Sequence, residues 1–450
     1  MWFSLTLCLL LPVTLLRPKV GLLAVVFLLP FMPRYLGIGI GEEGFALSPR
    51  RIAFIAFVSG LFVHAMFRAD MLNRASVIVR SNKYFFVLIA LVLLVRTFST
   101  IVNSGLNLQL LYVLDDLVIT LAPAAGVLLL VNSADDERHV LVALLAALFV
   151  SAGIASVEAS KGGMILQGLV AVSVEEAGRS GLTDIFRGDA YRAKALFDNP
   201  LLLAEFACIV WPLGVYLYYA GVSQAQRLFA LAACLAAPLT IALTHARSGW
   251  LVFLRGRAGF TTLRGWDSSG PIARAPLVAA FVIACSGIGL FGFHIVDEAI
   301  STMGNGVEGA RSIVERLNQY AVVASAMSES PMLGYGMSRN ILTNLDSLDH
   351  IDNFWLRLLL EGGLLLLVAF LFLAIRTITM TFSGRNDAGS RNCRMFMSAA
   401  LISLLSFLAY KNFVSMPINN SLFFLIAVLV MRRDFWNHIG RNHARTSLSQ

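Results

Sequence analysis

The chain has 450 residues, of which 58% are hydrophobic and 14% are charged, and its formal net charge at pH 7 is +8. A soluble domain carries about 25% charged residues, so this composition excludes an ordinary globular protein and indicates an integral membrane protein. The basic residues cluster in short loops between apolar runs, as the positive-inside rule predicts. We therefore interpret the net charge as a topology signal and expect no nucleic-acid partner.

Long apolar stretches predict an all-α, polytopic transmembrane helical bundle of about twelve to thirteen spans, because one helical span needs about 20 mainly apolar residues. The stretches lie near residues 2–16, 20–38, 51–68, 84–101, 109–131, 138–157, 200–220, 228–245, 247–260, 274–293, 353–375, 395–410 and 418–432. The first two are short and interrupted by proline. Arg255 and Arg257 interrupt 247–260, which we interpret as a short span with arginines that snorkel to the interface. No repeat is visible, so we expect a single membrane domain over residues 1–450.

Lysine and arginine predict the orientation of the bundle. Basic segments 68–83, 255–274 and 376–394 and the basic tail 432–450 can all lie in the cytoplasm. The external loops are then 158–199 and 294–352, together with the turn at 245–248. Within the second loop, apolar residues recur at helical spacing over 308–329, which predicts an external amphipathic helix on the membrane face.

The five cysteines have no CxxC spacing, and four of them lie in apolar runs. This usage indicates neither a disulfide framework nor a metal site. The predicted external segments also lack a carboxylate cluster of the kind that holds a divalent cation. We expect no metal and no cofactor.

The first polar constellation precedes the apolar stretch at 200–220. Arg192 and Lys194 lie just before the point where the chain enters the membrane, and Asn199-Pro200 follows them. Proline after a polar residue is ordinary capping chemistry at a helix start. Capping explains Asn199 and Pro200 but leaves the two cations as candidates for binding an anionic substrate.

The second constellation is the turn from Thr244 to Trp250, which contains His245 and Arg247. A charged residue this close to hydrocarbon is costly unless it is paired or functional. We favour a functional Arg247, with His245 as a supporting residue. The alternative is an interfacial arginine that snorkels beside the belt tryptophan Trp250.

The third constellation begins on the predicted amphipathic helix. Arg311 and Arg316 lie on this helix, and a Pro-x-x-Gly-x-Gly turn follows, with glycines at Gly334 and Gly336. Glycine lets another group approach the backbone closely. We predict substrate contact for the two arginines and a supporting role for the two glycines.

The same constellation ends at the next apolar stretch. His350, Asp352 and Asn353 lie at its head, and Glu361 lies within it. Each of the first three is a candidate catalytic residue, and Glu361 is a candidate supporting residue. The alternative for His350 is an ordinary solvated loop histidine.

Three external elements with arginines can meet at one exterior site. Guanidinium groups suit a diphosphate because they bind phosphate oxygens in a bidentate fashion and stay charged. A histidine or aspartate beside them can accept a proton from an attacking hydroxyl. Lys411, at the outer end of its stretch, is an additional phosphate candidate. Arg96 with Asp115 or Asp116 is instead interpreted as a buried structural ion pair.

These motifs, in this order, resemble those of the bacterial O-antigen ligase and polysaccharide polymerase superfamily. The first motif of the superfamily is Arg-x-x-Gly-x-Phe-x-x-Pro. Its counterparts here, with alanine in place of glycine, are Arg192, Ala195, Phe197 and Pro200. A Thr-x-Ser-Arg-Gly element is approximated, with one extra serine at Ser248, by Thr244, Ala246, Arg247 and Gly249.

The two remaining motifs of the superfamily also have counterparts. The third motif consists of an arginine, a tryptophan four residues later and a Pro-x-x-Gly-x-Gly turn. Its counterparts here, with tyrosine in place of tryptophan, are Arg316, Tyr320, Pro331, Gly334 and Gly336. The His-Asn-x-Tyr-Leu-x-x-Leu-x-Glu-x-Gly element is matched by Asn353, Trp355, Leu356, Leu359, Glu361 and Gly363. Asp352 stands where histidine is usual, so either His350 or Asp352 would take the role of that histidine.

The resemblance implies a GT-C-like membrane glycosyltransferase of the bacterial inner membrane, with its active site facing the periplasm. It implies an inverting, metal-independent transfer of glycan from undecaprenyl diphosphate to a sugar hydroxyl. The implied diphosphate ligands are Arg192, Arg247, Arg316, Lys194 and Arg311. The implied partners are this lipid-linked donor, the acceptor and membrane lipid, with a chain-length regulator as a further candidate.

Four functions follow from these observations, in order of preference. The first is a polymerase of lipid-linked oligosaccharide repeats in exopolysaccharide or lipopolysaccharide biosynthesis. The second is an O-antigen ligase that transfers the finished glycan to lipid A-core or another acceptor. The third, of another class, is a lipid-linked sugar flippase, which would place charges along a central path and often show two related halves. A structural scaffold is the fourth.

Overall fold

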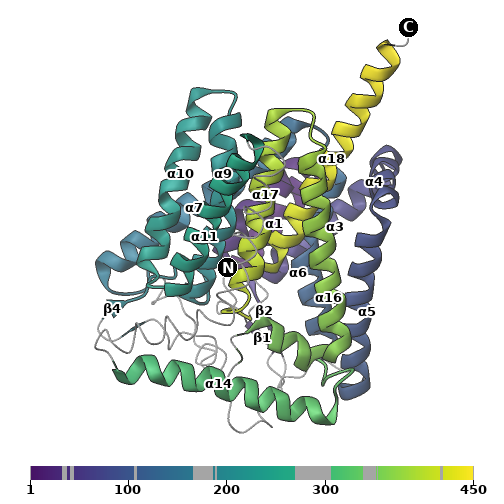
Figure 1. The fold of residues 1–450 in the computed structure, drawn as a ribbon. Helices are drawn as coiled ribbons and strands as arrows, with labels where there is room; N and C mark the ends of the chain where they lie inside the picture. The colour runs from purple at the N-terminus through teal and green to yellow at the C-terminus, as the bar shows by residue number, and fades with distance from the viewer. Residues whose placement is uncertain are drawn as a thin grey trace.

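A computed structural model describes residues 2–32, 38–40, 45–105, 109–165, 186–187, 190–268, 306–337, 351, 353–415 and 419–448. These residues form a bundle of long helices (Figure 1). Within the described residues, eight helices are long and apolar enough to cross a membrane. The predicted all-α, polytopic transmembrane fold is confirmed.

The helices follow one another along the whole chain, and two short antiparallel hairpins accompany them. The helices are α1 (Trp2–Leu16), α2 (Pro18–Leu28), η1 (Leu29–Phe31), α3 (Pro49–Met66), α4 (Ala69–Ser81), α5 (Lys83–Ser104), α6 (Gln109–Leu130), α7 (Ala134–Lys161), α9 (Pro200–Ala220), α10 (Gln224–Leu243), α11 (Arg247–Ser268), α14 (Gly306–Glu329), α16 (Phe354–Asn386), α17 (Arg391–Tyr410) and α18 (Asn420–Leu448). The hairpins pair β1 (Ile38–Ile40) with β2 (Phe45–Leu47) and β3 (Phe186–Arg187) with β4 (Ala190–Tyr191).

Each predicted apolar stretch coincides with a described helix except 274–293, which lies outside the described residues. The first two helices are short, as predicted. The basic segment 68–83, expected as a loop, instead contains α4. Met71, Ala75 and Ile78 lie on one face of α4 and are buried, while its charged residues lie on the other. The charges dominate the local composition and so hide the helical spacing of the apolar residues.

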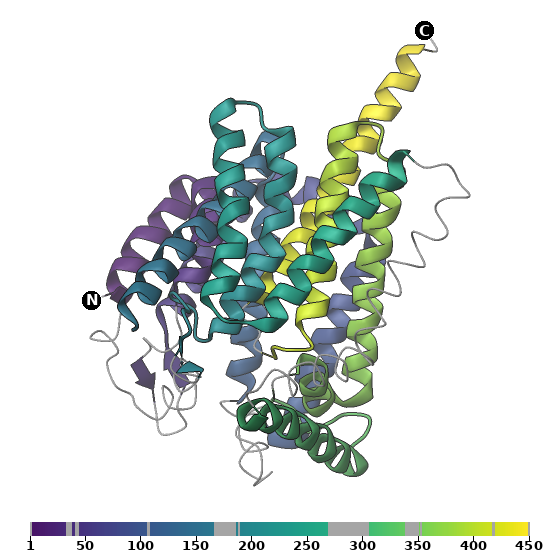
Figure 2. The same ribbon diagram turned by 60° about the vertical axis from the view of Figure 1, so that its left-hand side comes forward.

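The two ends of the bundle differ. At the end called here the α14 end, α14 lies across the other helices, at the bottom of Figures 1 and 2. The opposite end, called the α4 end, carries α4 and the last turns of α18 (Figure 1). The predicted amphipathic helix at 308–329 is confirmed by α14, which buries Val323 and Ala326 against Leu356 and Leu360 of α16.

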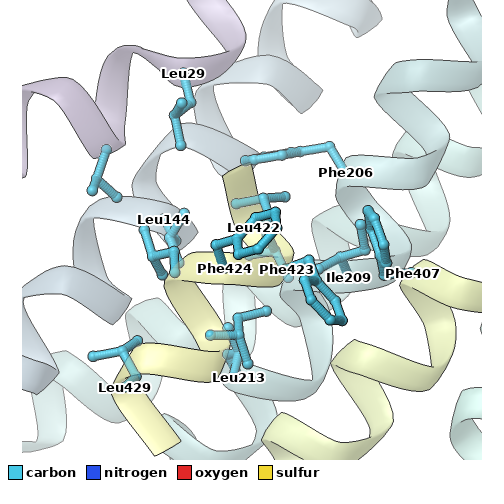
Figure 3. Close-up of a cluster of buried hydrophobic side chains, with 14 of the residues drawn as sticks. Leu29, Leu144, Phe206, Ile209, Leu213, Phe407, Leu422, Phe423, Phe424 and Leu429 are labelled. Carbon is cyan, nitrogen blue, oxygen red and sulfur yellow. The ribbon is translucent and has the colours of Figure 1, made fainter. Parts of the chain in front are cut away.

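The core surrounds α9, which is buried along most of its length between α7, α10, α11 and α17. Figure 3 shows Phe206, Ile209 and Leu213 of α9 in one cluster with side chains from η1, α7, α17 and α18. In hydrocarbon, helix association depends on close packing rather than on exclusion of water. This packing fixes the ends of α9, α17 and α18, where the polar residues lie.

Local capping explains where α9 begins. Asn199 Oδ1 accepts a hydrogen bond of 2.8 Å from the backbone N–H of Leu201, and Pro200 occupies the first helical position. The capping role inferred for these two residues is confirmed. The chain just before them needs an uncommon backbone, because Ala195 has a φ of 50° and is buried. The superfamily motif carries glycine at this position.

Replacing Ala195 with glycine should stabilise the protein. A left-handed backbone costs a non-glycine residue about 1–2 kcal/mol, and glycine removes this cost while adding unfolded-state entropy of about 0.4–1 kcal/mol. We expect Ala195→Gly to raise the free energy of unfolding by up to about 1 kcal/mol, measured by thermal unfolding in detergent. The matched control, Ala193→Gly, is equally buried but has no positive φ and should destabilise. Equal destabilisation by both variants would contradict the strain at Ala195.

Candidate functional site

The Pro-x-x-Gly-x-Gly turn docks into a break in α16. The dihedral angles of Gly362 and Gly363 are not helical, so the hydrogen-bond ladder of α16 is interrupted there. The carbonyl of Leu360 accepts a hydrogen bond from the N–H of Tyr335 at 2.7 Å, and the carbonyl of Glu361 accepts one from the N–H of Gly336 at 3.0 Å. The turn thus satisfies carbonyls that the break leaves open.

Glycine is required on both sides of this contact. Gly334 has a φ of 59°, and a Cβ there would lie 2.5 Å from the carbonyl oxygen of Leu360. Gly363 has a φ of 63°, and a Cβ there would lie 2.3 Å from the backbone of Met332. A Cβ at Gly336 would lie 2.7 Å from Thr100. In the described residues, the close approach predicted for Gly334 and Gly336 is an approach of backbone to backbone.

Polar side chains of α5 hold the turn from the other side. Ser99 Oγ donates to the carbonyl of Glu361 at 2.9 Å and also contacts the carbonyl of Leu333. Asn103 Nδ2 donates to the carbonyl of Gly334 at 3.2 Å, and Thr100 Oγ1 accepts from the N–H of Met337 at 3.0 Å. Sequence reasoning missed this support. The available signal was the grouping of three polar residues near the end of an otherwise apolar stretch.

Beneath the turn, Glu361 joins a buried ion network. Its Oε2 lies 2.8 Å from Arg96 Nη2, and its Oε1 lies 2.6 Å from Arg357 Nε. Arg96 also pairs with Asp116, so the predicted structural ion pair is confirmed for that aspartate. Asp115 pairs instead with Arg51, at 3.0 Å.

The network lines a cavity of about 50 Å³, together with Phe354, Ser415 and Asn420. Sequence reasoning missed Arg357, although its spacing of four residues from Glu361 is the usual signal for a pair on one helix face. Two guanidinium groups hold Glu361 next to the α16 break, and its supporting role in the functional site stays a prediction. Its carboxylate is not open to solvent.

Asn353 connects α16 to α14. Its Oδ1 caps α16 by accepting hydrogen bonds from the N–H groups of Trp355 at 2.9 Å and Leu356 at 3.3 Å. Its Nδ2 donates to Tyr320 Oη of α14 at 3.2 Å. Tyr320 is the aromatic residue of the third motif, so a polar contact joins the third and fourth motifs.

The adjacent backbone connects α16 to the end of α17. The N–H of Phe354 donates to the carbonyl of Lys411 at 3.0 Å. Lys411 Nζ lies 2.9 Å from Glu205 Oε1, and both side chains are fully buried. Asn419 Nδ2 donates to the other carboxylate oxygen of Glu205 at 2.8 Å. The Lys411 amine therefore forms an internal ion pair in this structure. It does not lie where the suggested phosphate contact would require it.

The first and second motifs meet at the end of α10. The N–H of Ala193 donates to the carbonyl of Leu243 at 3.0 Å, and Arg192 Nε donates to the carbonyl of Thr244 at 3.2 Å. Arg247 is the first residue of α11 and is exposed. Its neighbour Ser248 donates from Oγ to Tyr410 Oη of α17 at 3.4 Å.

These contacts form a continuous path through all four motifs. The path runs from the Arg192 segment to the α10–α11 turn, from there to the end of α17, and then through the start of α16 to α14. All of these elements meet toward the α14 end (Figures 1 and 2). Tertiary contacts therefore bring together motifs that are separate in the sequence.

Lys194 is fully buried, and its Nζ lies 3.4 Å from the carbonyl of Asp198. Burial lowers the pKa of the Lys194 amine, and the carboxylates of Asp198 and Glu158 oppose that shift. A diphosphate contact would require this side chain to leave its present surroundings. His245 is exposed and has a φ of 49°, so it forms the bend of the α10–α11 turn.

The remaining predicted site residues lie at the limits of the described structure. Arg311 and Arg316 belong to α14, but their side chains lie outside the described part of the chain. His350 and Asp352 lie outside the described residues altogether. The predicted arrangement of the proton acceptor and the third arginine therefore stays a prediction.

Comparison with known proteins bears on this arrangement. Residues 231–371 match the family model described as O-Antigen ligase. The match confirms the predicted resemblance to the O-antigen ligase and polysaccharide polymerase superfamily. It spans the second, third and fourth motifs, whereas the Arg192 segment precedes it. A search of curated proteins finds no match to this chain.

The contact between the turn and α16 gives a direct test of the superfamily's Pro-x-x-Gly-x-Gly element. We expect Gly334→Ala to lower stability by several kcal/mol, because it adds left-handed strain and a Cβ only 2.5 Å from the Leu360 carbonyl oxygen. Thermal unfolding in detergent measures the effect. The control is Gly153→Ala in α7, where no atom lies within 4 Å of the added Cβ. That control should be neutral or slightly stabilising, and similar losses in both variants would contradict the docked turn.

Proposed function

We propose that the chain is a membrane glycosyltransferase of surface polysaccharide assembly that works at the α14 end. The observation that carries the proposal is the path of contacts joining all four motifs of the superfamily. The four motifs extend from Arg192 to Gly363 along the chain, and tertiary hydrogen bonds bring them to one end of the bundle. In this proposal the arrangement serves a common site for one substrate.

Arginines are the proposed ligands of the donor diphosphate. Arg247 is exposed at the start of α11, and Arg192 donates a hydrogen bond to the carbonyl of Thr244 in the preceding turn. Arg316 and Arg311 lie on α14, which a hydrogen bond to Asn353 ties to the same region. The planar guanidinium group can donate two hydrogen bonds to phosphate oxygens, and it stays positively charged at any physiological pH. The proposed donor is a glycan on undecaprenyl diphosphate.

The proposed reaction is a single inverting displacement. The oxygen of an acceptor sugar hydroxyl attacks the anomeric carbon of the donor glycan and forms the new glycosidic bond. The bond between that carbon and the phosphate oxygen breaks, and its electron pair leaves with undecaprenyl diphosphate. The hydroxyl proton passes to His350 or Asp352. The arginines neutralise the charge that develops on the departing diphosphate, so the proposed step is metal-independent.

The preferred assignment is a polymerase that joins lipid-linked oligosaccharide repeats. Asp352 stands where the superfamily motif usually has histidine, and polymerases of the superfamily vary more at this motif than ligases do. The second candidate is an O-antigen ligase acting on lipid A-core or another acceptor, which the description of the matching family favours. We place the protein in the bacterial inner membrane with the α14 end facing the periplasm, since the basic segments 68–83, 376–394 and the tail then face the cytoplasm.

The lipid-linked glycans that accumulate in a deletion strain separate these assignments. For the polymerase we expect single repeats to accumulate on undecaprenyl diphosphate, sized by gel and mass spectrometry. Long polymer on its lipid, with none on the final acceptor, would assign the ligase instead. Donor trapped on the cytoplasmic leaflet would assign a flippase, and no accumulation at the outer face would contradict the glycosyltransferase.

Arg247 gives the sharpest test of the diphosphate site, because it is exposed and α11 offers a matched control. We expect Arg247→Ala to reduce glycan transfer by about 10²-fold or more, as removal of a group that stabilises developing charge commonly does. Arg247→Lys should recover only part of the activity, because lysine lacks the guanidinium fork. Transfer is measured in membranes with equal amounts of protein.

Arg257 is the control for this experiment. It is exposed on the same helix, about three turns further along. Arg257→Ala should therefore transfer glycan at the wild-type rate. An unchanged rate in Arg247→Ala, or an equal loss in Arg257→Ala, would contradict the assignment of Arg247.

A further inference from the structure

The α4 end carries a cavity of about 390 Å³, far from the proposed glycosyltransfer site. Ligand sites in proteins commonly occupy about 300–1,000 Å³. The walls come from the α1–α2 turn, the end of α3, the start of α4 and the end of α6. The charged and titratable lining residues are Arg17, Lys19, His64, Arg68, Asp70 and Arg74.

Positive charge exceeds negative charge in this cavity. Asp70 is the one carboxylate among the lining residues, and it pairs with Arg74 at 2.5 Å. Lys19 pairs with Asp136 at 2.7 Å. Arg17 and Arg68 form no ion pair with any residue in the described ranges. Among the described residues, two guanidinium groups in this concave site therefore have no ion-pair partner.

A further cation lies next to the wall. Arg432 of α18 is buried, and its guanidinium contacts the carbonyl of Leu128 and Asn132 Oδ1, the latter at 3.5 Å. Asn132 lines the cavity. A single anion in the cavity would thus be attracted by positive charges from three regions of the fold, which are the α1–α2 turn, the α3–α4 junction and α18.

The surroundings of the cavity are apolar and exposed. Leu16 is 82% exposed, Met66 is 68% exposed and Phe67 is 83% exposed. In a membrane, such side chains face acyl chains rather than water. The neighbouring α4 buries one apolar face and presents its arginines on the other, as helices in the plane of the interface do. The cavity therefore lies at the depth of the lipid headgroups.

We propose that this cavity binds the phosphate headgroup of an anionic membrane lipid. The recognised chemistry is a phosphate ester, held by the guanidinium forks of Arg17 and Arg68. Basic pockets between transmembrane helices bind anionic headgroups in the same way. A free phosphate shares this chemistry but would lack the acyl chains that contact Leu16, Met66 and Phe67. The bound lipid bridges the α1–α2 turn to the α3–α4 junction.

The test measures the thermal unfolding of the full chain in detergent as lipid is added. We expect phosphatidylglycerol to raise the midpoint by several degrees, with no comparable shift from phosphatidylcholine. Inorganic phosphate at the same phosphate concentration should give no shift. The double variant Arg17→Ala/Arg68→Ala should weaken phosphatidylglycerol binding about tenfold or more. Arg80→Ala is the control, because Arg80 lies on α4 but does not line the cavity.

Each alternative outcome has one meaning. An unchanged phosphatidylglycerol shift in the double variant overturns the proposal. An equal loss in Arg80→Ala also overturns it, because the effect would then be general surface charge. A shift from inorganic phosphate as large as that from lipid rejects the lipid and assigns the site to free phosphate. If the double variant fails to fold, Arg68→Gln is tested alone, and native mass spectrometry counts retained phosphatidylglycerol.

Discussion

The structure depends on one constraint, which is that no backbone polar group can stay unsatisfied where water is excluded. The break at Gly362 and Gly363, in the first third of α16, interrupts the helical hydrogen bonds that would satisfy this constraint. The turn that contains Gly334 and Gly336 restores it by donating two N–H groups to the open carbonyls. The glycines of the third and fourth motifs thus lie on the two sides of one backbone contact. The close contact between these two backbone segments accounts for glycine at Gly334 and Gly363.

A second constraint concerns charge. Buried ions are tolerated when they are paired, and removing one partner leaves a costly uncompensated charge. Glu361 is held by Arg96 and Arg357, and Glu205 is held by Lys411. These pairs fix the α16 break and the end of α17, which in turn position Asn353. Cations at the membrane edge therefore divide into two groups. Arg96, Arg357 and Lys411 have carboxylate partners and stabilise the fold, whereas the exposed Arg247 is the proposed contact for an anionic substrate.

The sequence predicted well what depends on local periodicity. The apolar stretches, the amphipathic helix at 308–329 and the cap at Asn199 follow from residue spacing along one segment. It failed where composition masks periodicity, as in α4, and where a partner lies far along the chain. Glu158 of α7 accepts a hydrogen bond from the backbone N–H of Lys194, and Ser99 of α5 supports the turn that contains Gly334. Glu158 carries no signal in the sequence that marks it as a partner of this segment. Ser99 does belong to a group of three polar residues near the end of an apolar stretch, but this grouping does not identify the distant turn that it binds.

The two proposals give arginine different tasks at the two ends of the bundle, and α5 connects these ends. Its first residue, Lys83, follows α4, and its last turns bind the Gly334 turn through Ser99 and Asn103. A rigid helix of 22 residues transmits a displacement at one end to the other. A lipid that fixes the α3–α4 junction would therefore also restrain the end of α5 that supports the α16 break. We therefore expect headgroup binding at the α4 end to be mechanically coupled to substrate positioning at the α14 end. Both would stabilise the same helix, α5.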